Sequence, residues 1–233
     1  MKKFVLMLAV LAFLTSCNQI TGSGNLVTQT RNVENFDALK VGGGFEVEVR
    51  IGSPAKVVIE ADDNVIEDIR ATVSNGQLEI SVEDGISFTD AEMKVSITTE
   101  KLSRISSSAS ANVVVVGDMK SNETVKLKAS SGSSIQATVD APATEADASS
   151  GAEITVRGKT RSLAAESSSG ATVKASDLLS ENTRAQASSG ASTNVHASVG
   201  LDAQASSGGS VAYRGEANVV KKESSGGSIS KRD

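Results

Sequence analysis

The chain has 233 residues and a net charge of −5, with 3% aromatic residues and no tryptophan. Acidic and basic residues are interspersed, so no basic stripe could follow a phosphate backbone, and stacking surfaces for bases or sugar rings are nearly absent. This composition argues against nucleic acid as a partner and against an aromatic sugar-binding platform.

The N-terminus has the organisation of an export signal. Two lysines precede an apolar run, residues 4–14, which is too short to span a bilayer. The run leads into Leu-Thr-Ser-Cys, in which Cys17 is the only cysteine of the chain. This pattern resembles a bacterial lipoprotein signal, whose cysteine is lipid-modified and begins the mature protein. We therefore expect residues 1–17 to be the signal with its lipobox, and Cys17 to anchor the protein to the outer membrane, on the periplasmic face or at the cell surface.

The segment after the signal divides into a short tether and a β-rich region. Residues 18–28 are polar and contain glycine, which is typical of a tether. Residues 29–105 contain several alternating apolar and polar runs, and Asn75-Gly76 between two of them predicts a β-hairpin. We expect this N-terminal region to cap the structure that follows, because a bare coil end would expose unpaired strand edges.

Residues 106–233 contain the tripeptide Ser-Ser-Gly six times, with 19, 19, 20, 18 and 18 residues between successive glycines. The residues around each glycine alternate, because odd offsets are apolar or small and even offsets are polar. This period of two marks strands with one buried face. The outward polar position four residues before each glycine is the candidate binding face, and it holds Lys128, Asp147, Glu166, Gln186, Gln204 and Lys222.

A repeat of about 19 residues with period-two strands predicts an all-β, parallel β-solenoid, right-handed by the general rule for parallel connections. Each Ser-Ser-Gly would form a corner, where glycine permits positive φ. The second serine has odd parity, so we expect it to face inward with its hydroxyl paired. The predicted corner residues are Ser131, Gly132, Ser150, Gly151, Ser169, Gly170, Ser189, Gly190, Ser207, Gly208, Ser225 and Gly226. We also interpret residues 105–117 as a degenerate first copy, with alanine in place of the glycine.

Catalytic, cofactor and metal sites are not indicated. His196, the single histidine, falls on the outward parity and is interpreted as a surface residue, so six serines lack an oriented base. The one dense acidic group, Asp62-Asp63 with Glu67-Asp68, is interpreted as a helix start carrying surface charges. If it instead formed a paired-carboxylate site, the protein would be a β-helix enzyme acting on polysaccharide.

The chain resembles the head GIN domain family, also described as putative auto-transporter adhesins. The resemblance lies in "NFDALKVGGGFEVEVRIG", in the hairpin around Leu78, in "MKVSITTEKLSRISSSASANVVV" and in the spaced Ser-Ser-Gly copies, and it covers residues 30–230. It implies a β-helical extracytoplasmic protein, commonly a lipoprotein, and it supplies no site residues.

Three functions remain open at this point. The first is a non-enzymatic, adhesin-like or envelope-interaction module that binds a protein or polysaccharide. The second is an envelope spacer or a self-associating subunit that forms a homo-oligomer. The third, the polysaccharide-acting enzyme, has the least support.

Overall fold

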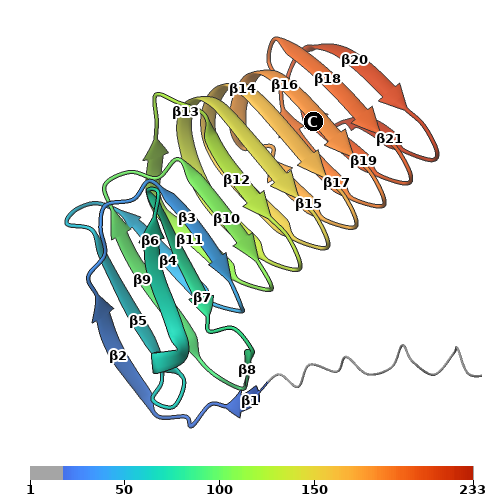
Figure 1. Cartoon of the computed structure of the whole chain (residues 1–233). Coiled ribbons are helices and arrows are strands. Elements are labelled where there is room, and N and C mark those ends of the chain that lie inside the picture. The colour runs from blue at the N-terminus through green and yellow to red at the C-terminus, as the bar shows by residue number, and fades with distance from the viewer. Residues whose placement is uncertain (1–17, 233) are drawn as a thin grey trace, which may run out of the picture.

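The computed structural model describes residues 18–232 and is built almost entirely of strands (Figure 1). One hydrogen-bonded sheet of 19 strands runs through the N-terminal region and the repeats. The helical element within the described residues is a short 3-10 turn, η1 (Ile66–Asp68). The predicted all-β solenoid is therefore confirmed.

The repeats stack as parallel coils, as the period predicted. The strands are β10 (Arg104–Ser108), β11 (Asn112–Lys120), β12 (Val125–Ala129), β13 (Ser134–Ala148), β14 (Glu153–Ser167), β15 (Thr172–Ala175), β16 (Leu178–Ala187), β17 (Ser192–His196), β18 (Gly200–Ala205), β19 (Ser210–Arg214), β20 (Asn218–Glu223) and β21 (Ser228–Lys231). Strands that follow a Ser-Ser-Gly corner form one side of the solenoid, side A. Strands that precede a corner form the opposite side, side B.

The solenoid interior is narrow because small and β-branched residues fill it. Three residues after each glycine, the column on side A is buried and consists of Ile135, Ile154, Val173, Thr193, Val211 and Ile229. Five residues before each glycine, Leu127 and a run of alanines form the matching buried column of side B. Alternating burial along each strand thus produces one continuous core.

Each Ser-Ser-Gly forms a corner with two consecutive left-handed residues. Ser131 has φ 52° and Gly132 has φ 71°, and Ser133 N donates to Ser130 O at 3.2 Å, as in a type I′ turn. The backbone also bonds between coils, because Gly132 N donates to Ser150 O at 3.0 Å. The repeat of the tripeptide therefore reflects a corner that every coil must build with the same unusual backbone.

The predicted inward position of the second serine is wrong. Ser131 and its equivalents are exposed at the tips of the corners. The physical reason is that alternation holds only along an extended strand, and two left-handed residues interrupt it. The exposed serines are Ser131, Ser150, Ser169, Ser189, Ser207 and Ser225.

The first corner differs by one residue from the predicted register. Asn112 pairs with Ser134, so Ser110, and not an alanine, lies where later coils have glycine. Ala109 and Ser110 have φ 50° and 62°, and Ser110 N donates to Ser131 O at 3.0 Å. A non-glycine residue therefore adopts the same corner backbone.

The N-terminal region extends the solenoid and then caps it. Strands β3 (Ala38–Gly42) and β4 (Glu46–Ile51) form a coil that stacks parallel on β10 and β11, and β7 (Gln77–Val82) and β9 (Met93–Thr99) stack parallel on β3 and β4. Beyond them, β5 (Lys56–Asp62) and β6 (Ile69–Ser74) pair antiparallel with β9 and β7. The predicted hairpin at Asn75-Gly76 joins β6 to β7 and is confirmed.

Residues 18–28, expected to form a tether, instead contain β1 (Asn18–Thr21) and the start of β2 (Leu26–Arg31). Strand β1 pairs with β8 (Ile86–Thr89), and β2 pairs antiparallel with β5 at the edge of the cap. Exposed and half-buried side chains alternate along β2, and none is buried, as expected for an edge strand. A strand of this kind has a polar composition, and for this reason the segment resembled a linker in the sequence.

The last coil closes the core with a charged residue. Lys221 takes the place that alanines occupy in earlier coils, and its Nζ lies 5.1 Å from the centre of the Tyr213 ring. Among residues 18–232, strands β20 and β21 pair with β18 and β19 and with no strand on their other side. Lys221 thus makes a cation–π contact with Tyr213 at the end of the solenoid core. The unpaired edges of β20 and β21 lie beside this contact.

Candidate functional site

The predicted binding face forms one column on side B. Lys128, Asp147 and Glu166 occupy successive registers of β12, β13 and β14, and Gln186, Gln204 and Lys222 continue the column through β16, β18 and β20. All six side chains are exposed or half-buried. The structure therefore brings the six predicted residues together on one outward surface, which we call the polar column.

The polar column is longer than the repeats indicated. Ser106 pairs with Lys128 on one side and with Lys40 on the other, and Lys40 pairs with Glu79. The Lys40 and Glu79 side chains form an ion pair at 2.8 Å. These three members carry no repeat signal in the sequence, because the coil of β3 and β4 is separated from β10 by the inserted cap strands and carries no Ser-Ser-Gly.

Contacts along the polar column run between neighbouring coils. Lys128 Nζ lies 3.5 Å from Asp147 Oδ2, so the two side chains form an ion pair. In the amide orientation that satisfies both neighbours, Gln186 donates to Glu166 at 3.1 Å and accepts from Arg184 at 2.9 Å. A shallow hollow of about 220 Å³ lies beside these residues and the corner serines. The column is thus a flat, hydrogen-bonding surface without a deep pocket.

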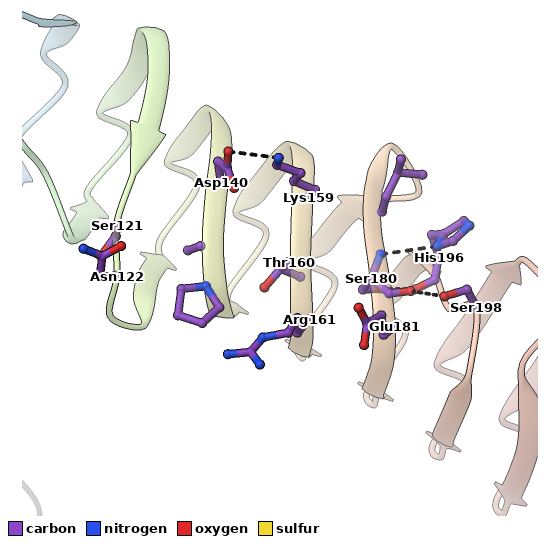
Figure 2. A pocket seen from close by; sticks show the side chains of 13 residues that line it. Ser121, Asn122, Asp140, Lys159, Thr160, Arg161, Ser180, Glu181, His196 and Ser198 are labelled. Atoms are coloured by element: carbon purple, nitrogen blue, oxygen red, sulfur yellow. Dashed lines mark hydrogen bonds and ion pairs between the residues drawn. The ribbon is translucent and has the colours of Figure 1, made fainter.

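A larger hollow of about 720 Å³ lies at a different corner of the coils, between the side-A and side-B strands (Figure 2). Its floor is a column of small residues, Ala141, Thr160 and Ser180, which are in register on β13, β14 and β16 and are buried. We call this hollow the trough, because its floor runs from coil to coil along the solenoid axis.

Two rims border the trough. One rim carries Asp140, Lys159 and Leu179, which are in register, and Lys159 Nζ lies 3.3 Å from Asp140. The other rim carries Arg161 and Glu181 on successive coils, and Figure 2 shows Arg161 extending away from Glu181. Each rim therefore presents charges of both signs across a floor of methyl and hydroxyl groups.

His196 closes the trough at its C-terminal end and is half-buried, so its interpretation as an outward surface residue is only partly correct. Ser180 N donates to its Nδ1 at 3.4 Å, and Thr183 Oγ1 donates to its carbonyl oxygen at 2.8 Å. Ser198 Oγ donates to Ser180 O at 3.2 Å. The imidazole therefore accepts from a backbone N–H group, while hydroxyl groups bond to the His196 carbonyl oxygen, and together these contacts hold the end of the trough in place.

No signal in the repeat alignment identified the trough. The coil lengths change from 19 to 20 and then to 18 residues across it. Counted from the preceding glycine, Leu179 is therefore shifted by one residue from Asp140 and Lys159, but all three lie eleven residues before the following glycine. This column holds an acid, a base and a leucine, so no recurring residue type marks it.

The acidic group at residues 62–68 ties the N-terminal segment to the cap. Asp62 is buried, and its carboxylate accepts from Gly24 N at 2.5 Å and from Glu92 N at 2.9 Å. Asp63 is exposed and accepts from Ser23 and Asn25, and these hydrogen bonds lower its pKa below the usual range for aspartate. Asp62 is thus engaged with backbone groups, and the predicted helix start at Asp63 is replaced by η1, whose N-cap is Val65.

Cys17, the predicted lipidation site, lies outside the described residues. From Asn18 to Arg232 no cluster of three or more potential metal-ligating side chains is present. Within the same span, no helix has the length and apolar character needed to cross a membrane.

A family model described as "Putative auto-transporter adhesin, head GIN domain" matches residues 35–217. The chain belongs to this family. The resemblance seen in the sequence is therefore confirmed. A comparison with curated proteins finds no match.

Solved structures of similar fold include proteins from Bacteroides and Parabacteroides species. A protein from Bacteroides fragilis described as a putative adhesin superposes with a TM-score of 0.83 at 17% identity, covering 91% of this chain and 100% of its own. A putative adhesin from Parabacteroides merdae gives 0.73 at 17% identity over 93% and 100%. A Parabacteroides distasonis protein described as a putative lipid binding protein gives 0.71 at 16% identity over 93% and 100%. At these low sequence identities, the likeness shows a shared fold and nothing about function.

Proposed function

We propose that this head GIN domain protein is an extracytoplasmic, adhesin-like binding module without catalytic activity, attached to the outer membrane through a lipid on Cys17. The observation that carries the proposal is the polar column. Its members lie in register from β7 to β20, all on one side of a rigid stack. A surface of this kind suits a partner that makes many weak contacts, either a protein or a polysaccharide.

Membrane attachment at the N-terminal end is consistent with the arrangement of the coils. Strand β1 begins directly after Cys17 and lies in the cap, far from the last coils β20 and β21 (Figure 1). A lipid at Cys17 would therefore hold the cap near the membrane and direct the repeats away from it.

Enzymatic action on polysaccharide has weaker support than binding. The hypothesis depended on Asp62 and Asp63 acting as a carboxylate pair. Asp62 is only 1% exposed and uses both carboxylate oxygens to accept backbone N–H groups. A carboxylate held in this way has a structural role, so binding is the function that the geometry supports.

Self-association is a second candidate function, because β20 and β21 leave open strand edges at the C-terminal end. The exposed charges of Lys221, Lys222 and Glu223 oppose uncontrolled pairing at that edge. Sedimentation of the purified protein over a range of concentrations distinguishes a stable homo-oligomer from a monomeric binding module.

If the polar column binds the partner, the binding free energy should be divided among its residues. Replacing all six residues from Lys128 to Lys222 by alanine should reduce retention of the purified protein on mucin-coated and envelope-coated surfaces by about tenfold or more, because many weak contacts are lost together. Glu166→Ala alone should change retention by less than about threefold, since one exposed polar contact contributes little.

The matched control replaces four outward residues of side A by alanine, namely Gln136, Thr155, Lys174 and Ser230, and should retain wild-type binding. Complete loss of retention from Glu166→Ala alone would contradict a distributed surface. The absence of retention on both coatings would count against the binding module itself.

A further inference from the structure

The trough has the length and direction to hold a chain. Its buried floor runs from Ala141 through Thr160 to Ser180, and the exposed Ser198, whose N–H donates to Ser180 O at 3.0 Å, continues the line on a fourth coil. At about 4.8 Å per coil, the floor extends roughly 15 Å along the solenoid axis. A ligand that fills it must therefore be extended and must lie parallel to that axis.

The walls of the trough favour a polyhydroxylated ligand over a peptide strand. The strands at the floor are already paired on both sides, since Thr160 pairs with Ala141 and with Ser180, so the trough offers no free strand edge for β-augmentation. Its polar groups are instead carboxylates, hydroxyls, an amide and a guanidinium, on both rims. A sugar hydroxyl group can donate a hydrogen bond to one of these groups and accept a hydrogen bond from another.

The charges are arranged in a definite order along the trough. Lys159 and Arg161 flank Thr160 on the middle coil, one on each rim, whereas Asp140 lies on the coil before and Glu181 on the coil after. Among residues 18–232, no hydrogen bond or ion pair engages the Arg161 side chain. The middle coil therefore carries two cations, Lys159, which pairs with Asp140 at 3.3 Å, and Arg161, whose guanidinium is uncommitted, and the coils on either side carry carboxylates.

We propose that the trough binds a linear polysaccharide in which acidic sugars alternate with neutral ones. An acidic group lies against Arg161 and Lys159, where a guanidinium binds carboxylate in a bidentate manner. The neutral sugars on either side donate hydroxyl hydrogen bonds to Asp140 and Glu181. This site is separate from the polar column, and the proposal deepens the proposed function by naming a chemical class of partner.

The experiment measures binding of defined hexasaccharides to the purified protein by titration calorimetry at low and moderate salt. Hyaluronan hexasaccharide supplies alternating uronic acids, hexagalacturonate supplies an acid on every sugar, and cellohexaose supplies none. We expect hyaluronan hexasaccharide to bind at least about tenfold more tightly than either of the other two, because only its pattern matches one cationic coil between two acidic ones.

Arg161→Gln should weaken that binding by about tenfold, whereas Arg184→Gln, an exposed arginine of side B outside the trough, should leave it unchanged. Circular dichroism checks that both variants keep the wild-type fold. Equal losses from the two variants would show diffuse charge attraction and would overturn the proposal.

Three further outcomes would also overturn it: no binding of hyaluronan hexasaccharide, equal binding of hexagalacturonate, or equal binding of an alternating Glu-Gly hexapeptide, which would assign the trough to peptides. If one of these outcomes occurs and the sixfold alanine variant of the polar column still binds coated surfaces more weakly than the wild type, the trough proposal alone fails. If the saccharide binds while that variant loses nothing, the polar column fails as the binding surface.

Discussion

Replacing Gly158 by alanine is expected to lower the free energy of unfolding by at least about 3 kcal/mol. Gly158 has φ 107°, and a Cβ built there would lie 2.1 Å from Val139 O on the neighbouring coil. The backbone of β13 cannot move aside without breaking its pairing with β14. Thermal and urea unfolding followed by circular dichroism measure the effect.

Gly151→Ala is the matched control, because Gly151 has φ 72° at a corner and a Cβ there would meet nothing within 4 Å. It should cost only the conformational penalty, about 1 kcal/mol. Comparable losses from the two variants would contradict the close approach of the coils at Gly158. Gly158 directly precedes Lys159 and Thr160, so its positive φ sets the direction of the backbone that leads into the trough.

Asp62→Ala is the second large effect that we expect, with a loss of about 3 kcal/mol in the stability of the cap. The substitution leaves the N–H groups of Gly24 and Glu92 without their buried acceptor. Hydrogen exchange followed by mass spectrometry should show faster exchange in segments 22–25 and 90–93, with the distant coils unchanged.

Asp63→Ala is the control for Asp62→Ala, because it removes an adjacent but exposed carboxylate and should leave exchange around Glu92 at the wild-type rate. If Asp62→Ala leaves both segments protected, then the carboxylate does not hold the N-terminal segment to the cap.

The repeat period and the alternation along strands were sufficient to predict the solenoid and the outward polar residues. Both depend on strand geometry, which is local and recurs in each coil. The prediction was wrong for Ser131 and its equivalents, because a two-residue left-handed corner interrupts the alternation. It was also wrong for the first corner, where Ser110 replaces the expected alanine.

Features formed between distant segments could not be predicted. Strand β2 lacks a strong apolar pattern and is held by its pairing with β5 and by the bond from Gly24 to Asp62. One rim of the trough holds an acid, a base and a leucine, Asp140, Lys159 and Leu179, at the same offset from the following glycine, so no recurring residue type marked it in the repeat. The extension of the polar column to Lys40 likewise joins segments that are far apart along the chain.

Protease accessibility of the protein in its own cells tests whether it is an anchored binding module outside the cytoplasm. We predict that added protease removes the repeats either on intact cells or once the outer membrane is opened, and that Cys17→Ala releases the protein from the membrane fraction. Digestion on intact cells would place the polar column and the trough where an external partner can reach them. Protection until the cytoplasmic membrane is broken would contradict the claim.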